Sequence, residues 1–203
     1  MWLFDKLKNV FSSGDSKTNN TSNTSSYNST NTSASKPQSN VVSFTFNELP
    51  QSLEDLKRLS EASLDTPFKT AALAILSFCV YSKNKEEGIK MINFLRGPKG
   101  SLLPSEIQFY DDRFKDNGKY VPFSYFKGAT PETEYEPSKP YTLEFYTDSH
   151  SYEQATYCKL NTRSNGADSS RQIMLRVASG KWYLWEQYVL VGIRVPKSQN
   201  PWG

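Results

Sequence analysis

The chain has 203 residues, with 24 lysines and arginines against 21 aspartates and glutamates, so the formal net charge is only +3. So small a charge provides no electrostatic footprint for nucleic acid, and nucleic-acid binding is not expected. Two cysteines are too few for a disulfide framework, and no apolar run reaches the roughly 18 residues that a membrane-spanning helix needs.

Residues 1–11, MWLFDKLKNVF, place large apolar side chains at helical spacing, with charged and polar residues opposite. An isolated helix this short is marginal in water and forms when its apolar face meets a surface. The two lysines on the polar side suit a membrane interface or the groove of a protein partner. Docking on its own domain is the alternative. The candidate anchor residues are Trp2, Leu3, Phe4, Leu7, Val10 and Phe11.

Residues 12–40 consist almost entirely of Ser, Thr and Asn. Such a segment cannot bury enough apolar surface to offset the entropy of ordering, so we expect a disordered linker. One folded domain should then cover residues 41–203, a length that can bury most of its apolar surface. The start of the chain carries no secretion-signal pattern, and the expected location is cytoplasmic, either free or peripheral to the membrane.

Four helices are predicted in the first half of the domain, after a short alternating stretch at 42–46 that resembles a strand. Ser52, Thr66 and Asn84 are typical helix N-caps, and Pro67 suits a first helical position. The predicted helices cover about 53–59, 67–82, 85–96 and 104–115. The second is apolar on nearly all sides, which predicts a buried central helix.

The stretch Val121–Pro140 has neither a helical nor a strand period, and each of its prolines fixes φ and removes a backbone donor. Loops of this length are uncommon in compact domains and are usually functional or disordered. Its aromatic side chains favour an ordered loop wrapped on the domain surface. These rings either only fill the gap between two halves of the domain, or form a ligand or partner surface through Phe123, Tyr125 and Tyr135.

After this loop the apolar period changes to two, which is typical of strands. The predicted strands cover about 141–146, 157–163, 173–177 and 182–185, with a last strand at 189–195. Short sequential strands with tight turns form an antiparallel meander. The sequence therefore predicts an α+β domain, with about four helices packed on one face of a C-terminal antiparallel β-meander. Cys79 and Cys158 fall within apolar patterns and should be buried free thiols.

The stretch 164–172, SNGADSSRQ, joins two predicted strands and contains Asp168 and Arg171. These two residues can pair and fix the turn, or bind a polar ligand together with Arg163. The serines of the turn have no histidine to activate them, because the only histidine, His150, lies in another turn. His150 also lacks partners at metal-ligand spacing. No catalytic residue, metal or cofactor is therefore expected.

Several motifs resemble an uncharacterised family of bacterial domains, a domain of unknown function found mainly in Gram-positive bacteria. The motifs are TPFKTAALAIL, GIKMINFLRGP, SYFKGATPETEYEPSKPY, NGADSSR, WYLWEQYVLVGIRVP and NPWG. The resemblance covers about residues 46–202 and implies no known activity, substrate or cofactor. Members often have Ser-Gly-Gly-Ala-Asp-Ser-Pro-Arg in the turn, where this chain has Asn165 and Ser170, so the turn should be less rigid here.

Three functions remain open from the sequence. The first is a non-enzymatic cytoplasmic binding module, attached to a membrane surface or an unknown protein partner through residues 1–11. The second is an enzyme acting on a small polar or sugar-like substrate with Asp168, Arg171 and Tyr125. The third is a structural subunit of a larger assembly, with the aromatic loop as its interface. A deep pocket joining those three residues would favour the enzyme, and an exposed aromatic patch would favour the binding module.

Overall fold

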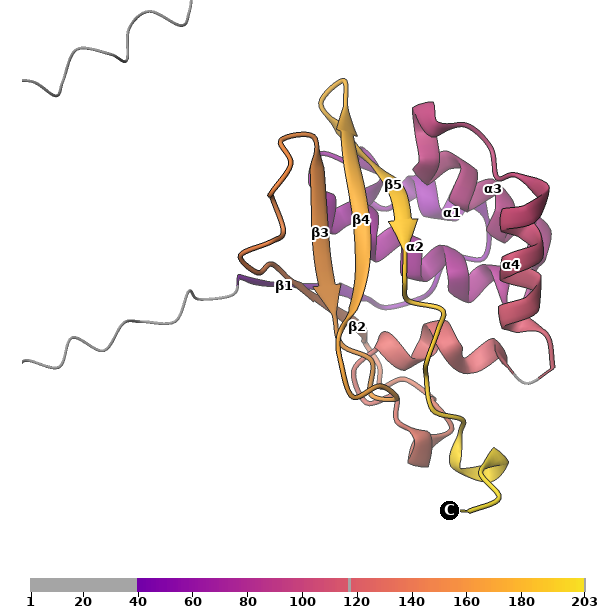
Figure 1. Cartoon of the computed structure of the whole chain (residues 1–203). Coiled ribbons are helices and arrows are strands. Elements are labelled where there is room, and N and C mark those ends of the chain that lie inside the picture. Colours follow the sequence, from indigo (N-terminus) through magenta and orange to yellow (C-terminus); the bar gives the residue numbers. More distant parts are fainter. Residues whose placement is uncertain (1–39, 117, 203) are drawn as a thin grey trace, which may run out of the picture. The chain divides into compact units, whose positions relative to one another are not determined.

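The computed structural model describes residues 40–116 and 118–202 of the chain. A five-stranded antiparallel sheet carries its helices on one side, as Figure 1 shows. The predicted α+β architecture is therefore confirmed. The expected amphipathic helix at 1–11 and nearly all of the expected linker lie outside the described residues. None of the described helices is long and apolar enough to cross a bilayer.

The strands of the sheet follow one another in space in the order of the sequence. They are β1 Val41–Phe46, β2 Tyr141–Tyr146, β3 Tyr157–Thr162, β4 Arg171–Ala178 and β5 Lys181–Gln187. β1 pairs with β2 along its whole length, with Val41 opposite Tyr146 and Phe46 opposite Tyr141. The short alternating stretch before the helices is thus an edge strand of the sheet, and β5 is the other edge.

The helix α2, Pro67–Tyr81, lies at the centre of the domain and packs against β2, β3, β4 and β5. The side chain of Thr66 accepts a hydrogen bond from the Lys69 amide, and Pro67 occupies the first turn, as predicted. Only Phe68 and Lys69 within this helix are not fully buried. Complete burial of a single large apolar side chain contributes about 1.5–3 kcal/mol, so α2 organises the hydrophobic core.

The remaining α-helices begin and end within a residue or two of their predicted bounds. They are α1 Leu53–Arg58, α3 Lys85–Arg96 and α4 Pro104–Phe114. Ser52 and Asn84 accept hydrogen bonds from the amides of Asp55 and Glu87, so both predicted caps are confirmed. Cys79 and Cys158 are buried free thiols, also as predicted.

The connection between the helices and the sheet is more regular than predicted. It contains two 3₁₀ helices, η3 Gly118–Tyr125 and η4 Pro131–Thr133. Tyr125 and Tyr135 keep only 4% and 2% of their surface exposed and belong to the hydrophobic core. The expectation of an irregular loop lying on the surface is therefore wrong, because its aromatic side chains fill the space between helices and sheet.

The prediction of a strand at 189–195 is also wrong, because β5 ends at Gln187 and turns follow it. Side chains bind the carbonyl groups of this segment in place of a neighbouring strand. The hydroxyl of Tyr125 donates to the Val189 carbonyl at 2.6 Å, and that of Tyr135 donates to the Arg194 carbonyl at 2.7 Å. Val189 and Leu190 are adjacent and both buried, so burial does not alternate along this segment as it would along a strand with one buried face.

The contact between α2 and α3 gives a test of this packing. A Cβ on Gly88 would lie 2.4 Å from the Cα of Tyr81, a backbone atom that cannot yield cheaply. We expect Gly88→Ala to cost about 3 kcal/mol through overpacking, well above the roughly 1 kcal/mol that alanine gains over glycine in a helix. Urea unfolding should therefore show a net loss of stability of about 2 kcal/mol. Equal or higher stability would contradict the close approach, and Lys90→Ala on the exposed face of α3 is the control.

Candidate functional site

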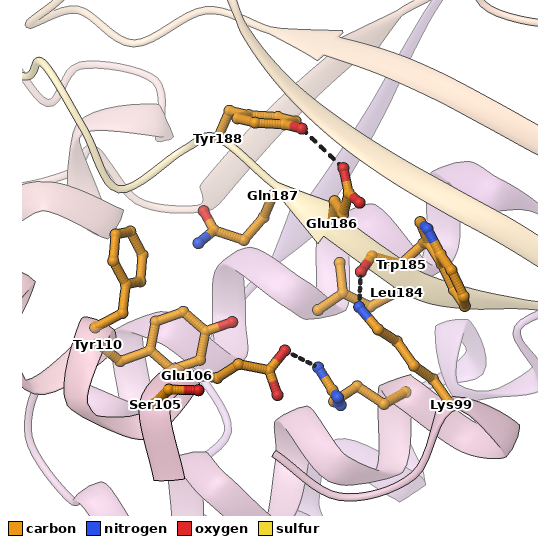
Figure 2. Close-up of a pocket in the computed structure, with 11 residues that line it drawn as sticks. Lys99, Ser105, Glu106, Tyr110, Leu184, Trp185, Glu186, Gln187 and Tyr188 are labelled. Atoms are coloured by element: carbon orange, nitrogen blue, oxygen red, sulfur yellow. Dashed lines mark hydrogen bonds and ion pairs between the residues drawn. The ribbon is translucent and has the colours of Figure 1, made fainter. Parts of the chain in front are cut away.

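A pocket of about 360 Å³ opens between α4 and the end of β5, and we call it the α4–β5 pocket. Figure 2 shows its labelled side chains converging from three parts of the fold. Arg96 and Lys99 come from the end of α3 and the 3₁₀ turn after it, η2 Gly97–Lys99. The other lining residues are Ser105, Glu106, Phe109 and Tyr110 of α4, and residues 184–188 of β5 and its end.

An ion pair fixes the floor of the pocket. The residue Arg96 is only 5% exposed, and its Nη1 atom lies 2.8 Å from Oε1 of Glu106. Arg96 also donates to the Gly100 carbonyl, and the second oxygen of Glu106 accepts from the Leu103 amide. The pair joins the last turn of α3 to the first turn of α4, where the helix dipoles favour a cation and an anion respectively.

The pKa of Glu106 reports the balance of forces at this pair. Burial raises its pKa, but the hydrogen bonds from the Leu103 amide and Arg96 outweigh burial and hold the pKa below the usual value of 4.5. Glu106 is therefore an anion near neutral pH, and it is not a proton donor for chemistry there.

Lys99 closes one end of the pocket. Its Nζ atom donates to the Trp185 carbonyl at the edge of β5 and lies 4.7 Å from the centre of the Trp185 ring. Burial, and then the charge of Arg96, lower the pKa of Lys99. The turn that carries Lys99 requires Gly97, because a Cβ there would lie 2.2 Å from a ring atom of Tyr183.

Aromatic side chains form the opposite wall and the mouth. Phe109 is 37% exposed and Tyr188 is 49% exposed, whereas Tyr110 is buried. The Tyr188 hydroxyl donates to Glu186 at 2.8 Å, and the hydroxyl of Tyr110 points into the pocket (Figure 2). Burial, followed by the negative charge of Glu106, raises the pKa of Tyr110 to about 12, so its hydroxyl remains protonated and can donate.

The side chain of Gln187 completes the wall on the β5 side. Its Oε1 atom accepts a hydrogen bond from the Val189 amide at 3.0 Å. That bond turns the amide group of Gln187 inward, and Figure 2 shows it pointing into the pocket. The pocket thus combines a fixed ion pair, inward-pointing donors and two partly exposed rings.

The structure does not bring the residues predicted for a partner surface together on the outside. Tyr125 and Tyr135 lie in the core, and Phe123 is half-buried with the Lys83 ammonium 4.8 Å from its ring centre. The rings therefore fill the gap between the two halves of the domain, which was the alternative left open by the sequence, and the expected aromatic partner surface is not formed by Tyr125 and Tyr135.

The predicted ion pair between Asp168 and Arg171 does not form. Asp168 pairs instead with Arg194, at 2.8 Å and at an exposed position. Arg171 donates to the carbonyls of Val191 and Gly192, at 3.0 and 2.8 Å. The reason is that the C-terminal segment lies against this turn and presents carbonyl groups that a guanidinium can bind.

A second cavity, of about 460 Å³, includes two of the predicted residues. Tyr125 and Arg163 line it together with Asn165, next to β2. Arg163 lies 5.9 Å from the ring centre of Tyr146. Asp168 and Arg171 line neither this cavity nor the α4–β5 pocket, so neither of the two joins the three residues of the enzyme hypothesis. No three described His, Cys, Asp or Glu side chains converge as metal ligands.

Sequence reasoning missed the α4–β5 pocket. Phe109 and Tyr110 lie within the helix predicted at about 104–115, and nothing in the sequence links this helix to residues 185–188. The available signal was the run of aromatic and polar residues at 185–188, Trp-Glu-Gln-Tyr, which is richer in functional groups than a simple strand end requires.

The Arg96–Glu106 pair predicts a defined pH dependence. Because the folded-state pKa of Glu106 is lowered, its ionised form stabilises the fold above the usual pKa of 4.5, and this contribution is lost as the pH falls through the lowered pKa. Wild type should be more stable than Glu106→Gln at neutral pH, and the difference should shrink as the pH drops well below 4.5. Urea unfolding of both proteins over this range measures it, and a constant difference would contradict the pair's role.

Comparison with known proteins identifies a family for the chain, but it finds no protein whose site could be compared with the α4–β5 pocket. No curated protein and no solved structure matches the chain. The model of one family, described as a domain of unknown function (DUF6935), matches residues 48–197. This range includes the helices α1–α4, the strands β2–β5 and every residue of the α4–β5 pocket. The chain therefore belongs to the family of the domain of unknown function DUF6935.

Proposed function

We propose that the protein is a non-enzymatic binding module and that the α4–β5 pocket is its ligand site. The observation that carries this proposal is the combination of a rigid polar floor with partly exposed rings at the mouth. Binding sites for small ligands are typically concave, of about 300–1,000 Å³, with aromatic walls and a few placed polar groups. The α4–β5 pocket has this size and composition.

Hydrogen bonds within the protein hold the polar side chains of the pocket. In the floor, Arg96 bonds to Glu106 and to the Gly100 carbonyl, and at the mouth Glu186 accepts from the Tyr188 hydroxyl. A ligand therefore does not have to immobilise these side chains, and the entropy cost of binding is lower. This order supports recognition of a specific partner.

The protonation states in the pocket support binding over catalysis. Glu106 is held as an anion, and the pKa of Tyr110 is raised to about 12, so neither exchanges a proton readily near neutral pH. Lys99 donates to a backbone carbonyl and stacks on Trp185. General acid–base catalysis instead favours a group whose pKa lies near the working pH.

We also propose that the protein is cytoplasmic and is attached to a membrane surface or a partner through residues 1–11. The support is the amphipathic pattern of that segment, which suits a membrane surface or a partner groove, and the Ser/Thr/Asn-rich stretch that separates it from the domain. The domain would then bind its ligand while held near the attachment point.

Removing the rings at the mouth should test the ligand site. Ligand-observed NMR with the full chain, against sugars, amino acids, nucleosides and short peptides, should find at least one bound class. Phe109→Ala together with Tyr188→Ala should weaken that binding at least tenfold, about 1.4 kcal/mol, because stacking area is lost. Tyr152→Ala removes another exposed ring outside the pocket and is the control. Equal binding by the double variant, or no bound class, would contradict the proposal.

The attachment through residues 1–11 has its own test. Sedimentation of the full chain with vesicles of phosphatidylcholine and phosphatidylserine should show binding, and Leu3→Asp with Leu7→Asp should abolish it. Ser12→Asp with Ser13→Asp adds the same charge in the expected linker and is the control. If the leucine variant sediments like wild type, this face is not a membrane anchor, and if neither protein sediments, a protein partner is the remaining attachment.

A further inference from the structure

We propose that the ligand of the α4–β5 pocket is an extended peptide segment of a partner protein, which pairs with the free edge of β5 as an added strand. This inference rests on the proposed binding function and specifies its ligand. It comes from the backbone of β5 at the pocket and from the side chains that face it.

The register of β5 shows where its backbone groups point. Gln187 lies opposite Ile173 on β4, and the next amide, that of Tyr188, donates to the Gln172 carbonyl at 2.9 Å. In antiparallel pairs the residues alternate between those that bond across the pair and those that point away from it. The N–H and C=O groups of Gln187 therefore point away from β4, toward the open edge.

At two other positions along the same edge, outward groups are occupied. The Trp182 amide donates to the Leu64 carbonyl at 2.8 Å, and the Trp182 carbonyl accepts from the Thr70 hydroxyl at 2.8 Å. Lys99 binds the Trp185 carbonyl. The fold thus covers the edge of β5 at Trp182 and at Trp185, whereas no side chain or loop amide in the described part of the chain binds the backbone of Gln187.

The open part of the edge coincides with the pocket. Gln187 lines it, and α4 stands opposite with Phe109 and Tyr110. A strand edge facing a helix across a groove is suited to peptide recognition, because main-chain hydrogen bonds give affinity and a pocket accepts alternate side chains. A residue of an extended peptide offers one acceptor and one donor at the spacing of an antiparallel pair, which matches the N–H and C=O of Gln187.

The side chains around the groove define the chemistry of the peptide. Phe109 and Tyr188 are the partly exposed rings and would contact an apolar or aromatic side chain of the peptide. Lys99 at one end and Glu186 near the other favour a peptide that carries an acidic residue toward Lys99 and a basic residue toward Glu186. Arg96 and Glu106 neutralise each other and leave no net charge for the ligand to match.

The test uses a matched pair of variants at one position. Gln187→Pro removes the outward amide, and Gln187→Ala keeps it, while both lose the side-chain bond to the Val189 amide. The missing amide points away from β4, so the ladder should survive, as it does for prolines on edge strands. A library of random nonapeptides displayed on phage is selected on the immobilised full chain, and the affinities of enriched synthetic peptides are measured for wild type and both variants.

We expect enriched peptides to bind Gln187→Pro at least tenfold more weakly than Gln187→Ala. N-methylation along such a peptide should abolish binding at one position, the amide that donates to the Gln187 carbonyl, and should be tolerated at the two neighbouring amides, which face away from β5. This scan, together with slowed hydrogen exchange of the Gln187 amide in the peptide complex of wild type, applies even if the proline variant does not fold.

Selection that enriches no peptide, equal affinity of a folded proline variant and the alanine variant, or a peptide that tolerates N-methylation throughout, would each overturn strand addition. If peptides or other ligands still depend on Phe109 and Tyr188 in that case, the binding pocket stands and only the strand pairing fails. If nothing depends on those rings, the proposed function fails as well.

Discussion

The carbonyl groups of residues 189–194 need hydrogen-bond donors, because this segment leaves the sheet after β5 and pairs with no further strand in the described part of the chain. Side chains from distant elements supply the donors. They are Tyr125 to Val189, Arg171 to Val191 and Gly192, Tyr120 to Ile193 and Tyr135 to Arg194. These bonds tie the aromatic connection, the turn before β4 and the end of the chain into one unit, with α4–β5 pocket residues Gln187 and Tyr188 at its border.

This arrangement explains why the aromatic connection is buried and yet matters for the site. Tyr125 does not contact the α4–β5 pocket, but it fixes Val189, whose amide in turn holds the side chain of Gln187. The polar ends of the tyrosines therefore act on the carbonyls of the last segment while their rings fill the core. Tyr125 and Tyr135, which the sequence suggested as part of a partner surface, thus hold the C-terminal segment that borders the α4–β5 pocket.

Local signals accounted for most of the fold. Ser52, Thr66 and Asn84 marked helix starts, and the all-round apolar pattern of α2 identified the central helix. The last strand could not be judged from 189–195 alone, because strand formation depends on a partner with free ladder groups, and here side chains took that place. The sequence did not reveal the α4–β5 pocket for a related reason. Glu106 and Glu186 belong to elements far apart in sequence, and only the packing of α4 against the end of β5 brings them together.

The most direct test of this account is amide hydrogen exchange in the full chain with Tyr125→Phe and Tyr135→Phe combined. Both substitutions keep the buried rings and remove the donors to the C-terminal segment. The account predicts faster exchange confined to the amides of residues 188–194, including the Val189 amide held by Gln187, with α2 unchanged. Unchanged exchange in this segment, or equal acceleration throughout the domain, would show that these hydroxyl groups do not hold it in place.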